Sequence, residues 1–194
     1  MKKRAILLVS CIFLLAIAAS AQTGTKQTDK DQKMTKPAPD KSKRLSPPAS
    51  AECKFTDGKT IHIDYSSPRV KGRKIFGAHE AYGQPWRAGA NEATTFVTTA
   101  DLTVGDKDVP AGDYTLFMIP NPDKWTLIIS KATGEWGIPY PGESQDFVRT
   151  DMKLSQTPAL VEELVYTFDQ TGSGCAMHLK WENSDASVSI NEKK

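Results

Sequence analysis

The sequence has few of the residues on which most enzyme chemistry depends. Its 194 residues include three histidines and three cysteines, and it has no G-x-S-x-G motif to present a nucleophilic serine. His62 and Asp64 have the i, i+2 spacing that metal sites use on a strand, but the sequence assigns no third ligand. We therefore predict no metal site and no cofactor, and no motif assigns a catalytic residue.

Long apolar runs are also scarce. The longest, residues 5–19, follows Lys2, Lys3 and Arg4 and is too short for a comfortable membrane span. Small residues at positions 19–21 then offer a cleavage site. We expect a signal peptide over residues 1–21, export to the periplasm or the exterior, and no membrane span. The alternative is a lipoprotein signal through Cys11, because "LVSC" loosely resembles a lipobox.

Aromatic residues are absent from residues 22–50, and large aliphatic residues are almost absent. Such a segment buries too little apolar surface to offset its ordering entropy, so we predict a disordered basic linker. The remaining residues, 51–194, are long enough for one domain. They contain 15 basic and 20 acidic residues, and this acidic balance gives no support for nucleic-acid binding.

Two cysteines remain after the expected cleavage, Cys53 and Cys175, near the two ends of the domain. Export makes oxidation available, which favours one disulfide between them. The alternative is two separate buried thiols.

Sustained helical periodicity is missing, and strand patterns run through the whole domain. Asp57-Gly58 predicts a tight hairpin turn between two β-rich runs. The runs "YTLFMI" and "WTLIIS" are apolar on both faces, as central strands are. In "CAMHLKWE", alternate residues are apolar, which indicates a half-buried strand. Roughly ten short strands with short connections predict an all-β fold, a single antiparallel β-sandwich.

An unusual concentration of polar side chains lies in residues 85–96, "PWRAGANEATTF". One interpretation is a ligand pocket with Trp86 as an apolar platform and with polar anchors. The proposed anchors are Arg87, Asn91, Glu92 and Thr94. The alternative is an internal Arg87–Glu92 ion pair, with Trp86 in the core and Asn91 in a turn.

A second polar stretch, "DYSSPRVKGR" (residues 64–73), spans the end of an expected strand and the start of a long loop over residues 66–90. Asp64 and Ser67 lie where a strand is expected to end. Arg69, Lys71 and Arg73 alternate, so in an extended chain they point to one side and could hold a carboxylate, phosphate or sulfate group. The alternative is a solvated loop.

Four motifs in order resemble the bacterial family called domain of unknown function 2911: "IDYSSPRVKGRKIFG", "YGQPWRAGANEATTF", "VPAGDYTLFMIP" and "WTLIISKATGEWG". The resemblance covers about residues 46–190. It implies an exported, single-domain β-protein and implies no activity. The family is expected to have apolar residues where this chain has "AHEA", so we do not expect family-wide chemistry at His79.

Our functional hypothesis is a binding module in the cell envelope for a small polar or anionic ligand, with a saccharide as one candidate. Its site would combine residues 86–94 with Asp64 and Ser67, and with Arg69 and Arg73 at the rim. One alternative is a hydrolase or isomerase that uses Asp64, Glu92 or His62. Another is a purely structural envelope protein. The sequence predicts no oligomeric state.

Overall fold

The computed structural model describes residues 40–193. The expected signal peptide, Cys11 and residues 22–39 of the expected linker lie outside this range. Within it, no helix has the length and hydropathy that a membrane crossing requires.

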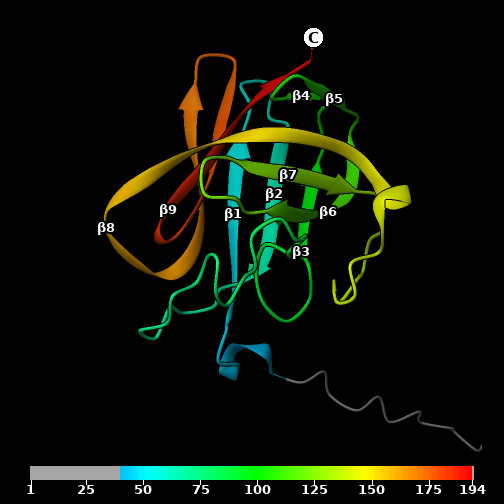
Figure 1. Cartoon of the computed structure of the whole chain (residues 1–194). Coiled ribbons are helices and arrows are strands. Elements are labelled where there is room, and N and C mark those ends of the chain that lie inside the picture. Colours follow the sequence, from blue (N-terminus) through cyan, green and yellow to red (C-terminus); the bar gives the residue numbers. More distant parts are fainter. Residues whose placement is uncertain (1–39, 194) are drawn as a thin grey trace, which may run out of the picture. The chain divides into compact units, whose positions relative to one another are not determined.

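Nine strands and two short 3-10 helices make up the described part (Figure 1). In chain order they are η1 (Lys41–Lys43), β1 (Pro48–Lys54), β2 (Thr60–Ser66), β3 (Thr94–Thr98), β4 (Leu102–Val104), β5 (Lys107–Val109), β6 (Gly112–Ile119), β7 (Trp125–Ser130), η2 (Glu143–Gln145), β8 (Asp146–Thr171) and β9 (Gly174–Glu192). The all-β prediction is confirmed.

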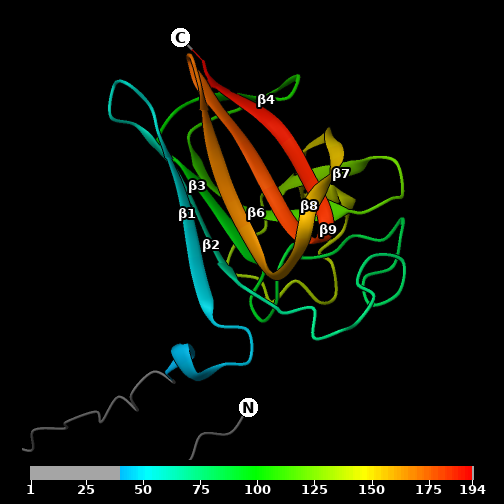
Figure 2. The ribbon, with the colours of Figure 1, turned by 90° about the vertical axis from the view of Figure 1, so that its left-hand side faces the viewer.

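The strands form one continuous antiparallel sheet in the order β1-β2-β3-β6-β7-β8-β9-β4-β5. Strand β8 pairs with β7 through its first residues and with β9 through the rest. Figure 2 shows the sheet folded over, with β1, β2 and β3 on one side and β8, β9 and β4 on the other. Because β8 pairs with both β7 and β9, all nine strands belong to one folded sheet, and the two separate sheets of a sandwich are not confirmed.

Two strands are much longer than the sequence pattern suggests. The runs "FVRTDMKL" and "LVYTFD" both lie in β8, and "CAMHLKWE" and "ASVSI" both lie in β9. Register shifts after Gln156 and after Val161 interrupt the pairing between these strands. Such irregularities bend a strand without ending it. The breaks in the alternating sequence pattern that suggested turns are therefore bends within β8 and β9.

The core lies between the two facing sides of the sheet. The predicted alternation in β9 is confirmed, since Cys175, Met177, Leu179 and Trp181 are all buried. Strand β7 is buried on both faces, as expected of a central strand, and Ile128 belongs to a small second cluster with Phe117 and Ala93.

Ordered structure begins earlier than the composition predicts. The expected linker extends to residue 50, but β1 begins at Pro48 and residues 41–43 form η1. The backbone N–H of Ser67 donates to the carbonyl of Pro47 at 2.9 Å. Residues 40–50 are polar, so their order depends on tertiary hydrogen bonds and ion pairs that composition does not reveal.

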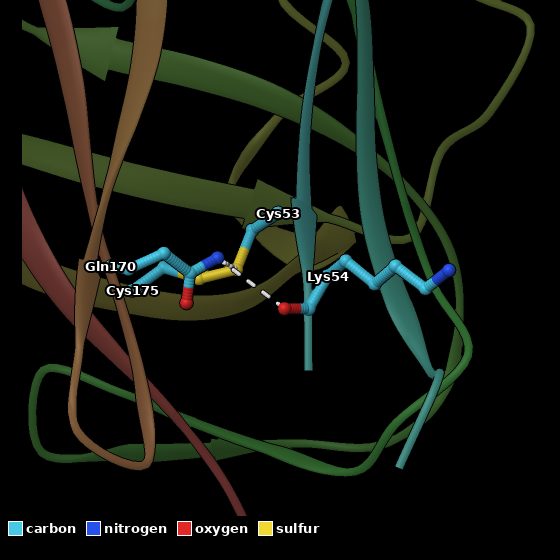
Figure 3. Close-up of a disulfide and its surroundings, with 4 residues drawn as sticks. All are labelled: Cys53, Lys54, Gln170 and Cys175. Carbon is cyan, nitrogen blue, oxygen red and sulfur yellow. Dashed lines mark hydrogen bonds between the residues drawn. A yellow bond between two sulfur atoms is a disulfide. The ribbon is translucent and has the colours of Figure 1, made fainter. Parts of the chain in front are cut away.

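The predicted disulfide is present. Cys53 of β1 and Cys175 of β9 are both buried, 122 residues apart in sequence. Beside them the Gln170 side-chain amide donates to the carbonyl of Lys54 at 3.3 Å (Figure 3). The disulfide therefore links β1, which is at one end of the sheet order, directly to β9 on the opposite side of the folded sheet.

Removing the disulfide by the double change Cys53→Ala and Cys175→Ala should lower the free energy of unfolding by about 2–5 kcal/mol, because the crosslink restricts the unfolded chain. Urea unfolding of both proteins, each with and without reductant, measures the effect. Reductant should shift only the wild-type midpoint. An unchanged midpoint after complete reduction of the wild type would show that the crosslink does not stabilise the fold.

Candidate functional site

The polar stretch of residues 85–96 forms a tight loop that leads into β3. Trp86 exchanges two backbone hydrogen bonds of 2.8 Å with Met118 of β6. The carbonyl of Ala88 then accepts from the Thr94 hydroxyl at 3.0 Å and from the Tyr166 hydroxyl at 2.9 Å. A side chain at Gly89 would lie 2.9 Å from the Thr94 hydroxyl. Thr94 is fully buried, so it closes the loop internally and is not placed to anchor a ligand.

Trp86 lies in the core, as the structural alternative proposed. Its side chain is 7% exposed and is stacked on Trp181, with ring centroids 5.8 Å apart. Phe76 and Trp125 complete an aromatic cluster around it. The indole N–H donates to the carbonyl of Gly89 at 3.2 Å. Trp86 therefore does not offer the open platform of the pocket hypothesis.

Arg87 does not form the expected ion pair with Glu92. Its guanidinium donates to the carbonyl of Trp136 at 3.0 Å and lies 5.5 Å from the centroid of the Trp136 ring. Burial lowers the pKa of Arg87, and the nearby carboxylates of Glu80 and Glu92 oppose that shift. The exposed tryptophan beside Arg87 is thus Trp136, which the sequence analysis did not single out.

Glu92 and Asn91 fasten residues 41–47, which we call the N-terminal strap. Both carboxylate oxygens of Glu92 accept from Arg44, at 2.5 and 3.1 Å, and Lys41 lies 3.1 Å away. The Asn91 amide donates to the carbonyl of Ser46 at 3.0 Å. The hydrogen bonds from Arg44, the largest cause, lower the pKa of Glu92 to about 2. The two residues therefore act as a clasp on the strap.

The predicted carboxylate pair, Asp64 and Glu92, lines one hollow of about 300 Å³ with Lys41 and Thr95. Asp64 lies 3.1 Å from a ring nitrogen of His62. No group of residues within the described range could hold a metal ion. With a pKa of about 2, Glu92 is a very weak base at neutral pH, which makes it a poor general acid or base.

Ser67 is buried, and its hydroxyl donates to the carbonyl of Leu164 at 2.6 Å. This bond belongs to a short pairing in which residues 68–70 lie against β8 where its register with β9 is interrupted. The backbone N–H of Val70 donates to Glu162, and that of Leu164 donates to Pro68, each at 2.9 Å. Ser67 therefore anchors the start of residues 67–73, which carry Arg69, Lys71 and Arg73 and which we call the basic loop.

The three alternating cations, by contrast, do meet at one place. Arg69, Lys71 and Arg73 line a hollow of about 310 Å³ with Leu45, Ser46 and Pro68. We call it the basic hollow. Arg73 donates to the carbonyls of Val70 at 3.0 Å and Arg69 at 2.6 Å, and Arg69 pairs with Glu163. The ammonium group of Lys71 forms no ion pair within residues 40–193.

A family model described as "Protein of unknown function (DUF2911)" matches residues 46–190. The chain belongs to this family. The resemblance inferred from the four motifs is thereby confirmed. Comparisons with curated proteins and with solved structures found no match.

The sequence analysis missed several residues that shape the site of this DUF2911 protein. Lys41 and Arg44 lie in a segment that composition assigns to the linker. Glu80 of the "AHEA" stretch is partly buried, and burial raises its pKa to about 7 although Arg87 and Arg73 oppose the shift. The only sequence signal for Glu80 was its departure from the expected apolar pattern, since burial of a single carboxylate depends on the tertiary fold.

Trp86→Ala should destabilise the protein by about 3–5 kcal/mol, because it removes a fully packed ring from the aromatic cluster. Trp136→Ala is the matched control. Its ring is 52% exposed, so we expect a loss of about 1 kcal/mol or less. Urea unfolding of both variants gives the comparison. Equal losses would contradict a core role that is specific to Trp86.

The clasp predicts a pH dependence. The pKa of Glu92 falls from 4.5 to about 2 on folding. Its ion pairs therefore contribute stability fully above pH 4.5, and this contribution is lost as the pH falls towards 2. The Glu92→Gln variant should be less stable at neutral pH, by at most a few degrees in Tm because the pair is partly exposed to solvent.

Thermal unfolding of the wild type and of Glu92→Gln between neutral pH and pH 2 tests this. The difference in Tm between them should shrink on acidification. Glu135→Gln is the control, because the Glu135 side chain forms no ion pair in the described part of the chain. A difference that is constant with pH would rule out the clasp as its origin.

Proposed function

We propose that this DUF2911 protein binds a small anionic ligand in the basic hollow. The observation that carries the proposal is that, among residues 40–193, three cationic side chains and no acidic side chain line this hollow. Carboxylate, phosphate and sulfate groups are the ligands that guanidinium and ammonium groups recognise by charge-assisted hydrogen bonds. The volume lies near the lower end of the range for small-molecule pockets, about 300–1,000 Å³.

The donors of the basic hollow are largely held in place before a ligand arrives. Arg73 is held by two backbone carbonyls, and Arg69 is held by Glu163. Fixed donors lose less conformational entropy on binding than mobile ones do. Lys71 has no competing ion pair within residues 40–193, so its ammonium group is the donor most available to an anion.

The clasp supports this site indirectly. Leu45 and Ser46 form the wall of the basic hollow that belongs to the strap, and Asn91 holds Ser46 through its carbonyl. Asn91 and Glu92 therefore contribute by positioning the wall and do not touch the anion. The proposed site therefore differs from the one expected from the sequence. Arg69 and Arg73, which were expected at the rim of the pocket, are at the centre of the proposed site.

We also infer export. A basic, apolar and small-residue pattern opens the sequence, and the buried Cys53–Cys175 disulfide is typical of proteins from oxidising compartments. The catalytic alternative that uses Asp64 and Glu92 has less support, because the low pKa of Glu92 suits an ion pair better than proton transfer. Among the residues that the structure describes, no specific contact favours a purely structural role.

Lys71→Gln should weaken anion binding about tenfold, which corresponds to about 1.4 kcal/mol. Glutamine removes the charge with a side chain only one bond shorter. Like lysine it is unbranched at Cβ, so it adds no β-branching at the positive φ of 50° at this position. Thermal shifts of the full chain with phosphate, sulfate and citrate, each at constant ionic strength against chloride, provide the measurement.

Lys153→Gln is the charge-matched control, because Lys153 is exposed on β8 and does not line the basic hollow. Sulfate and phosphate also stabilise proteins non-specifically, and such a shift would be equal in both variants. Equal shifts in wild type, Lys71→Gln and Lys153→Gln would therefore overturn the proposal, as would shifts no larger than that with chloride.

A further inference from the structure

A second hollow of about 320 Å³ has a different chemistry. Three segments meet there: the loop that carries Phe76 and Tyr82, the β6–β7 turn at residues 121–123, and the paired strands β8 and β9 near their first register shift. We call it the amide hollow. Its lining residues are Phe76, Tyr82, Asn121, Pro122, Asp123, Trp125, Leu154, Ser155, Gln156, Asn183 and Ser184.

Among residues 40–193, no cationic side chain lines the amide hollow, and its one charged residue is Asp123. An anion would find no cationic partner among them. The polar lining consists mainly of amides and hydroxyls, and each of these groups both donates and accepts hydrogen bonds. Such groups match the hydroxyls of a neutral sugar, which also donate and accept.

Three of these amides are uncommitted. Within residues 40–193, the side chains of Asn121, Gln156 and Asn183 form no hydrogen bond to another protein group. Gln156 and Asn183 are exposed and Asn121 is half-buried, so these amides face solvent and are not used by the fold as Asn91 is in the clasp. The three amides are therefore free to bond to a ligand in the hollow.

Tyr82 supplies an exposed aromatic ring at a fixed position. The ring packs directly on the backbone of Gly77, where an added Cβ would lie 2.4 Å from a Tyr82 ring carbon. The neighbouring Gly83 N–H donates to the carbonyl of Pro120 at 2.9 Å, which fastens this loop to the end of β6. Tyr82 is nevertheless 41% exposed. A rigid ring that is open on one face is suited to stacking against an apolar surface.

We propose that the amide hollow binds a neutral saccharide. Tyr82 stacks on the apolar face of a sugar ring, and the amides of Asn121, Gln156 and Asn183 bond to its hydroxyls. The hollow is large enough for a small ligand and is open at the surface, so a longer saccharide chain can continue outwards. The proposal is independent of anion binding at the basic hollow, because the two hollows share no lining residue.

Saturation-transfer NMR on the full chain tests the proposal, with glucose, galactose, mannose, N-acetylglucosamine, maltose and cellobiose as probes. At least one probe should bind to the wild type, and Tyr82→Ala should weaken its binding about tenfold. Phe147→Ala is the matched control, because Phe147 is also aromatic and 41% exposed but does not line the hollow. Its affinity should equal that of the wild type.

Asn183→Ala provides a second variant whose fold is not at risk, since Asn183 is exposed and its side chain has no partner in the described residues. It should also weaken binding of the same probe. The proposal is overturned if none of the six sugars binds, if binding survives in both Tyr82→Ala and Asn183→Ala, or if Phe147→Ala weakens it equally. Lys71→Gln should leave sugar binding unchanged, which separates this result from the test of the basic hollow.

Discussion

The stack of Trp86 on Trp181 is the contact on which the arrangement of the loops depends. Trp181 belongs to β9, and Trp86 belongs to the loop that leads into β3. Phe76, from the middle of the long loop, packs edge-on against both rings and against Trp125 of β7. Large aromatic rings bury much apolar surface with few rotatable bonds, so this cluster holds a loop that has almost no regular structure of its own.

Two sets of hydrogen bonds position the segments around this loop: side-chain bonds to the strap and backbone bonds to β8. Asn91 and Glu92 bind the strap and thereby bring Leu45 and Ser46 against the basic loop. The register shift in β8 leaves residues 162–164 free to pair with residues 68–70. The interruption in the pairing of β8 with β9 therefore lets β8 bond to the segment that carries the three cations.

The two hollows differ in chemistry because different side chains line them. They also differ in the bonds that these side chains already make to the rest of the protein. Two of the three cations of the basic hollow are held, Arg73 by backbone carbonyls and Arg69 by Glu163, so their charges are fixed in place. The amides of the amide hollow have no such partners in the described range, so their hydrogen-bonding capacity is open. Figure 1 shows the long loop between β2 and β3, which contributes residues to both hollows.

Sequence by itself determined the strand content, the antiparallel pairing and the family, because periodicity, turn residues and motifs are local signals. It favoured the Cys53–Cys175 bridge without settling it, since only two cysteines remain after the expected cleavage. It also pointed to the cations of the basic hollow, but from an extended-chain argument that the structure does not follow, because Lys71 lies in a turn and has a φ of 50°. Only the tertiary structure decided that the sheet is single, that Trp86 is buried, and that Glu92 binds Arg44 and not Arg87. These outcomes depend on contacts between residues far apart in the chain. Neither composition nor spacing indicates which of several distant residues a side chain will contact.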